Sequence, residues 1–144
     1  MWREKILNLH PNSIFSEPVL RGQVDDMEKS IGVSLPADFK NLLDESNGVT
    51  DEYGLGIVWS IERIREENLF ARNNPQYADI YMPLNPLVFF ADAGNGDLFG
   101  FAVVQNQIKL SRVFAWSHEN DSRTWVAPSL EKYLEWWLTG KIKL

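Results

Sequence analysis

The stretch from Leu87 to Phe101 constrains the fold of this chain most, because two runs of strand-forming residues flank a tight polar turn. Leu87–Ala91 and Leu98–Val104 are rich in the apolar and aromatic residues that favour strands. Gly94–Gly96 between them tolerates the positive φ that a chain reversal needs. We therefore predict a β-hairpin. Both runs are apolar nearly throughout, so we expect cover on both faces, or a helix on one face and a partner on the other.

Helical periodicity predicts five amphipathic helices around this hairpin. They run from Trp2 to Leu9, between Gly22 and Gly32, from Ser34 to Asn47-Gly48, from Ile61 to about Ala71, and from Pro128-Ser129 to Gly140. The third has the clearest start, because Ser34 is a capping residue and Pro36 suits the first turn of a helix.

The remaining segments predict shorter strands and loops. Strand patterns occur at Leu55–Trp59, around Ile108 and Leu110, at Val113–Trp116 and around Trp125. Residues 14–20, 49–54 and 72–86 are predicted as connecting or irregular segments. Consecutive strands with short turns pair antiparallel, so we predict an α+β fold in which a central antiparallel sheet of about four to six strands has its helices mainly on one side. The length of 144 residues predicts a single domain over residues 1–144.

The acidic residues are concentrated in residues 25–62. This segment holds nine acids and two bases, so it carries a net charge of −7, while the rest of the chain is nearly neutral; the acids are Asp25, Asp26, Glu28, Asp38, Asp44, Glu45, Asp51, Glu52 and Glu62. Two interpretations stay open: a solvated surface, or a face that steers a basic partner. The chain has no basic patch for a phosphate backbone, which argues against direct nucleic-acid binding.

The sequence contains no recognisable catalytic constellation. It has no cysteine, no Gly-x-Ser-x-Gly nucleophile motif and no glycine-rich phosphate loop between a strand and a helix. His118 and Glu119 begin like a zinc-protease motif, but no second histidine follows. We therefore predict a protein that is not an enzyme and needs no cofactor. The N-terminus has no signal-peptide pattern and no apolar run reaches the length of a membrane span, so we expect a cytoplasmic protein without membrane contact.

Oxygen-bearing side chains in the hairpin turn raise the alternative of a calcium site. Asp92, Asn95 and Asp97 lie close together in sequence. Their spacing does not match the calcium loop of alternating ligands that ends in a glutamate. Asp and Asn are also ordinary turn residues, because their side chains bond nearby backbone N–H groups. We therefore favour a structural turn without a metal.

Four ordered motifs carry a family resemblance. They are Ile31–Lys40 with its Leu-Pro-Ala-Asp-Phe-Lys helix start, Ser46-Asn47-Gly48 at the end of that helix, Phe89–Phe101 with its Gly-Asn-Gly-Asp-Leu-Phe hairpin, and Val113–Glu119 with its Trp-Ser-His-Glu end. Over roughly residues 22–139 this set resembles the SUKH superfamily, which includes the yeast cell-wall-synthesis regulator and many bacterial immunity proteins. The resemblance implies an α+β fold without catalytic residues.

The resemblance also implies a function. Bacterial SUKH proteins typically bind a cognate toxin, often a nuclease of a polymorphic or contact-dependent toxin system, and block it inside the producing cell. The partner expected here is a basic protein toxin. The alternative is a non-catalytic regulatory or scaffolding module, like the eukaryotic relatives. The residues expected to serve the fold are Pro36, Gly48, Gly94, Gly96, Asp97, Phe99 and Trp116.

Charge and expected exposure, rather than the resemblance, select the candidate contact residues. They are the acids Asp44, Asp51, Glu52, Glu119 and Asp121, together with Trp136. Trp136 lies off the apolar stripe of the last helix, and an exposed tryptophan beside acids is typical of a protein-binding face.

Overall fold

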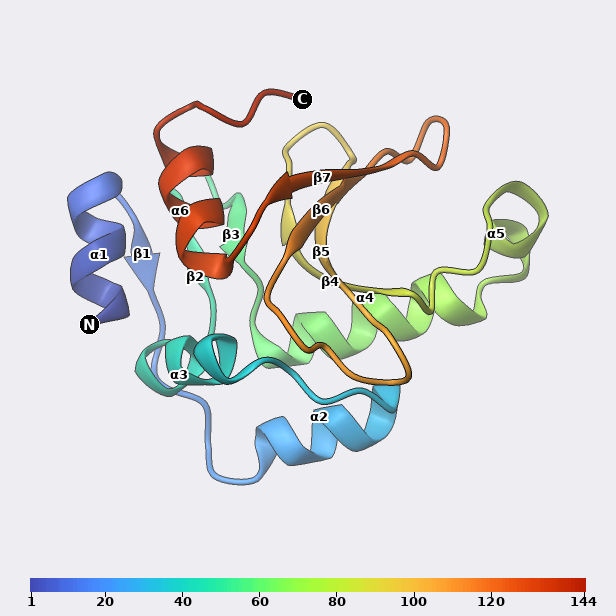
Figure 1. The fold of residues 1–144 in the computed structure, drawn as a ribbon. Coiled ribbons are helices and arrows are strands. Elements are labelled where there is room, and N and C mark those ends of the chain that lie inside the picture. The colour runs from blue at the N-terminus through green and yellow to red at the C-terminus, as the bar shows by residue number, and fades with distance from the viewer.

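The computed structural model describes residues 1–144 as an α+β fold of six helices and seven strands (Figure 1). The helices are α1 (Trp2–Leu9), α2 (Gln23–Ile31), α3 (Ala37–Glu45), α4 (Ile61–Asn73), α5 (Pro75–Ile80) and α6 (Leu130–Leu138). The strands are β1 (Ile14–Phe15), β2 (Val49–Thr50), β3 (Gly56–Val58), β4 (Leu87–Asp92), β5 (Leu98–Ala102), β6 (Val113–Trp116) and β7 (Arg123–Ala127). No helix combines the length and the apolar composition that a transmembrane span requires.

The strands form two antiparallel sheets. The larger has the order β4-β5-β6-β7 and the smaller the order β1-β2-β3. The amide of Trp59, directly after β3, donates a 2.7 Å hydrogen bond to the carbonyl of Phe90 in β4, which joins the two sheets. The predicted α+β class and antiparallel sheet are confirmed. The smaller sheet was not predicted, because β1 and β2 are two-residue strands inside segments 14–20 and 49–54.

The predicted hairpin is β4 and β5, and its strands are covered on both faces. On one face Phe90 stacks on Phe101 with centroids 4.2 Å apart, and Phe99 meets Tyr133 of α6 edge to face at 4.9 Å. On the other face Phe89 packs against Trp116 at 5.3 Å. A fully buried ring of this size stabilises the fold by about 2 kcal/mol, so this cluster anchors the sheet.

The start of α3 differs from the prediction. The helix begins at Ala37, with Pro36 in the cap position and no capping bond from a side chain. Ser34 is exposed and pairs through its backbone with Gln107. Leu35 turns into the core instead, and its amide is satisfied by the carboxylate of Glu28 from α2. α3 therefore begins without a side-chain cap, and the Glu28 carboxylate instead fixes the segment that leads into the helix.

Part of the predicted irregular segment 72–86 is helical. The helix α4 continues to Asn73, and α5 follows after one residue. Asn74 caps α5, because its side-chain oxygen accepts a 2.9 Å bond from the amide of Gln76. Pro75 stands at the first helical position, where its missing N–H costs nothing. The proline was a helix start rather than a loop signal.

The strand predicted around Ile108 and Leu110 is absent. Gln105 and Asn106 have positive φ, 53° and 61°, and make a tight turn. Beyond it, only Gln107 forms isolated bridges. β5 pairs with β4 on one side and with β6 on the other, so neither edge of β5 is free to pair with this segment. Ile108 is buried, whereas Leu110 is exposed.

Candidate protein-binding site

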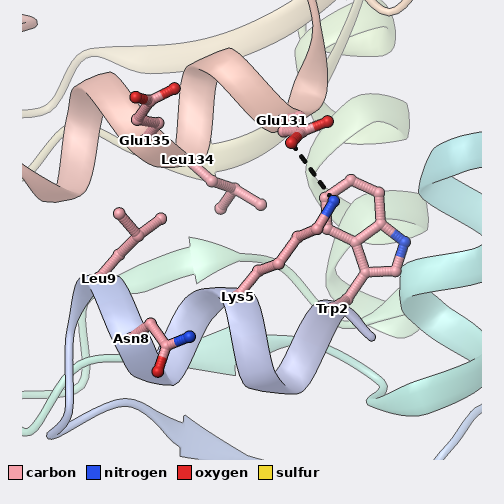
Figure 2. Close-up of a pocket in the computed structure, with 7 residues that line it drawn as sticks. All are labelled: Trp2, Lys5, Asn8, Leu9, Glu131, Leu134 and Glu135. Atoms are coloured by element: carbon pink, nitrogen blue, oxygen red, sulfur yellow. Dashed lines mark hydrogen bonds and ion pairs between the residues drawn. The ribbon is translucent and has the colours of Figure 1, made fainter.

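A groove lies between the first and the last helix (Figure 2). Its volume is about 340 Å³, and its lining comes from Trp2, Lys5, Asn8 and Leu9 of α1 and from Glu131, Leu134 and Glu135 of α6. These residues recur at three- and four-residue spacings, which places them on the facing sides of the two helices. We call this concavity the α1–α6 groove.

Both helices are held firmly in place. The Glu45 carboxylate accepts bonds of 3.0–3.1 Å from the amino group of Met1 and the amides of Trp2 and Arg3, so it caps the first turn of α1. Desolvation acts to raise the pKa of Glu45, but these hydrogen bonds outweigh it and hold the pKa below its usual value. In α6, the buried hydroxyl of Tyr133 donates a 2.8 Å bond to a carbonyl of β3. The walls of the groove are therefore rigid.

The two ends of the groove differ in their charge pairing. At one end Lys5 Nζ lies 3.3 Å from Glu131 Oε1 and 5.2 Å from the centroid of the Trp2 ring. At the other end the Glu135 carboxylate lies 2.9 Å from the ammonium of Lys132, which precedes it by three residues on the outer surface of α6. Leu9 and Leu134 approach each other between the ends (Figure 2). The groove thus has apolar walls, with the Glu131–Lys5 ion pair at one end and the Glu135–Lys132 ion pair at the other.

Two of the predicted contact residues lie in the turn between β2 and β3. His10 at the end of α1 pairs with Glu52 at 2.9 Å, which fixes this turn to the groove helix. Asp51 has a structural role as well, since its Oδ1 accepts bonds of 2.8 and 2.9 Å from the amides of Tyr53 and Leu55. Tyr53, at the tip, is 88% exposed.

Asp44 and Trp136 also lie near the groove helices. Asp44 is exposed on α3 and adjoins Glu45, the residue that caps α1. Trp136 follows Glu135 on the outer flank of α6; it is half-buried, and Lys141 Nζ lies 4.3 Å from its ring centroid. We call α1, α6, the end of α3 and the β2–β3 turn the α1–α6 side.

Glu119 and Asp121 lie elsewhere, in the β6–β7 loop at the upper right of Figure 1. Glu119 is exposed. The side chain of Asp121 is only 14% exposed, and its carboxylate accepts bonds from Trp116 Nε1 at 2.7 Å, Met82 N at 2.9 Å and Arg123 Nη2 at 3.1 Å. The prediction that Asp121 is exposed is therefore wrong, because its carboxylate binds three groups of the same chain.

The hairpin-turn carboxylates also serve the fold. Asp97 Oδ1 lies 2.7 Å from His118 Nδ1 and joins the β4–β5 turn to the β6–β7 loop. Asp92 forms a two-pronged ion pair with Arg63, with both oxygen–nitrogen distances 2.8 Å. Gly96, with φ +93°, lies against the His118 ring, where a Cβ would approach within 2.8 Å of it. Asp92 and Asp97, which the calcium alternative would have made ligands, thus bind different internal partners.

The acidic segment 25–62 does not form one face. Asp25 and Asp26 lie on α2, at the bottom of Figure 1, whereas the β2–β3 turn lies near the top. Glu28 pairs with Lys40 at 3.1 Å. The hypothesis of a single acidic surface therefore needs correction, because the net charge of −7 is spread over several elements.

Sequence reasoning predicted none of the seven residues that line the groove as a contact residue, and it also missed Tyr53. Leu9 was read only as part of a helix stripe, and Glu135 and Tyr53 were not singled out. The position of Tyr53 before Gly54 in a short turn was the available signal, since an aromatic residue at a turn tip has little to pack against.

Residues 21–134 match the model of a protein family described as SUKH_6, SMI1-KNR4 cell-wall. The chain belongs to the SUKH family. The matched range contains the helix start, hairpin and strand motifs that carried the resemblance, and the resemblance is confirmed. SUKH proteins are known as immunity proteins of polymorphic toxin systems and are generally non-catalytic. No curated protein matches this SUKH protein significantly.

The matched range excludes much of the groove. α1 lies entirely before it, and Glu135 and Trp136 lie after it. The α1–α6 groove is therefore lined largely by residues outside the family match, whereas the hairpin and its supports lie within it.

Proposed function

We propose that this SUKH protein is an immunity protein that binds and neutralises a cognate bacterial toxin domain, a basic nuclease of a polymorphic or contact-dependent toxin system. The observation that carries the proposal is the family match over residues 21–134. The internal use of Asp97, His118 and Asp121 is consistent with action by binding, because these polar side chains hold loops together.

The α1–α6 side is the surface that supports the proposal best. It presents the exposed ring of Tyr53 beside Glu52, and the groove carboxylates of Glu131 and Glu135. Aromatic residues near the centre of an interface contribute most of its binding energy, and carboxylates favour a basic partner. Asp44 and Trp136 extend this surface, while Glu119 lies outside it.

A second candidate is a regulatory or scaffolding module. It is favoured by the cell-wall regulators that give the matched family its description. Such a module would bind components of its own cell rather than a toxin. The two candidates differ in a measurable outcome, because only the first predicts protection of cells from a toxin domain.

The test needs the cognate toxin domain, which we expect as the basic C-terminal domain of a large protein encoded upstream of this chain. Cells producing that domain should survive when this protein is co-expressed, and the two should copurify. Combining Glu52→Lys with Glu135→Lys should weaken copurification at least tenfold, because two charges that face the partner are reversed. The matched control is Glu66→Lys on the exposed face of α4. Cell death despite a stable, well-expressed wild-type protein would contradict the proposal.

A further inference from the structure

We infer that the α1–α6 groove receives an arginine side chain from the protein partner. This inference rests on the proposed function and adds to it a site and the chemistry of the group that fills it. The groove is the concavity between α1 and α6 shown in Figure 2, with a volume of about 340 Å³. This volume accommodates one long side chain with room for the residue that carries it.

The walls suit the stem of such a side chain. Leu9 projects from α1 toward Leu134 of α6, and the two lie on opposite sides of the groove (Figure 2). Arginine places its three methylene groups along apolar surface while its charged head reaches a polar rim. The leucine pair is therefore complementary to the stem, and the end of the groove at Glu135 to the head.

Charge selects a cation. The lining contains two carboxylates and one ammonium group, and the ammonium of Lys5 is already placed between Glu131 and the Trp2 ring. Lys5 shows that this groove holds a cation at one end. A partner carboxylate would compete with Glu131 and Glu135 for the two lysines that these carboxylates already bind. An apolar residue would exclude water from the half-exposed Glu135 carboxylate and offer it no hydrogen bond in return.

Glu135 is available to a new partner. Its present ion pair with Lys132 is a surface pair three residues apart, in which both side chains are nearly half exposed. Such pairs contribute little to stability, so exchanging Lys132 for another cation costs little. A guanidinium binds a carboxylate through two parallel N–H donors, which an ammonium does not provide. Arginine therefore fits this end of the groove better than lysine.

The test titrates the whole protein with the blocked peptide acetyl-Gly-Arg-Gly-amide and follows methyl and amide resonances by NMR. We expect saturable shifts at Leu9 and Leu134. The same peptide with citrulline in place of arginine keeps the shape without the charge, and we expect it to bind at least fivefold more weakly. Glu135→Gln should weaken the arginine peptide by a similar factor, while Glu66→Gln on α4 should leave it unchanged. Absent shifts, or equal binding of the two peptides, would overturn the inference.

The toxin domain separates this inference from the proposed function. If wild-type protein captures the domain and Glu135→Gln captures it equally well, the arginine site is wrong and the immunity function stands. If the arginine peptide binds at the groove but the toxin domain is not captured, the proposed function is wrong. If Glu135→Gln weakens both the peptide and the toxin domain, both are supported.

Discussion

The carboxylate of Asp121 accepts a 2.7 Å hydrogen bond from the indole nitrogen of Trp116, five residues earlier in the chain. The same carboxylate bonds the amide of Met82 and the guanidinium of Arg123. It therefore joins the β6–β7 loop to the segment after α5. From the sequence, Trp116 is expected to serve the fold and Asp121 to contact a partner protein. The structure instead joins the two by a hydrogen bond.

Removal of this carboxylate should destabilise the protein. We expect Asp121→Ala to lower the free energy of unfolding by about 3 kcal/mol, because hydrogen bonds to a charged group are lost and the indole N–H of Trp116 loses its acceptor. Urea unfolding at pH 7 measures the change. Glu119→Ala, in the same loop but exposed, should stay within about 0.5 kcal/mol of wild type. Equal losses in the two variants would contradict the assigned role of Asp121.

The same residue predicts a dependence of stability on pH. Desolvation acts to raise the pKa of Asp121, but hydrogen bonds from Trp116, Met82 and Arg123 outweigh it, so the pKa lies below its ordinary value. A carboxyl group with a lowered pKa stabilises the fold fully above its unfolded pKa of about 3.9, and this contribution is lost as pH falls through the folded value. The stability advantage of wild type over Asp121→Asn should therefore be constant from pH 7 to about 5 and shrink below about pH 4. An advantage that grows on acidification would show that the sign is wrong.

Gly48 and Gly54 have nearly equal φ but different surroundings. Substituting each by alanine therefore distinguishes the cost of backbone strain from the cost of a steric clash. Gly48 has φ +93° and Gly54 φ +87°. A Cβ at Gly48 would lie 2.8 Å from the backbone nitrogen of Ser60, whereas one at Gly54 would meet nothing within 4 Å. Gly54→Ala should cost about 1 kcal/mol, from the left-handed conformation alone. Gly48→Ala should cost about 3 kcal/mol, because the clash with Ser60 adds to that strain. Thermal unfolding of the two variants checks this difference, and similar losses would place the glycine requirement in the backbone conformation alone.

The hairpin was predictable because its signals are local. Leu87–Ala91 and the Gly94–Gly96 turn carry apolar content and chain reversal within fifteen residues. The smaller sheet was not predictable, because β1 and β2 have only two residues each. Such short strands show no alternating pattern in the sequence and are recognised only by their pairing in the structure. The capping rule failed at Ser34 for a similar reason, because the backbone of this residue pairs with distant Gln107 and the helix begins three residues later, at Ala37.

The candidate site was predictable only in part. Composition pointed to acids and aromatics, and Glu52 and Trp136 do lie on the α1–α6 side. The groove itself joins Leu9 and Leu134, which are far apart in sequence, so no local pattern reveals it. Charge alone also misled at Asp121, because a sequence does not show whether a carboxylate faces solvent or an internal indole.

Hydrogen–deuterium exchange on the complex with the neighbour-encoded toxin domain tests the central claim most directly. Binding through the α1–α6 side predicts slower exchange in α1, in the β2–β3 turn around Tyr53 and at the end of α6, with little change in the β6–β7 loop around Glu119. Protection confined to the β6–β7 loop, with α1 and α6 exchanging as in the free protein, would contradict the account.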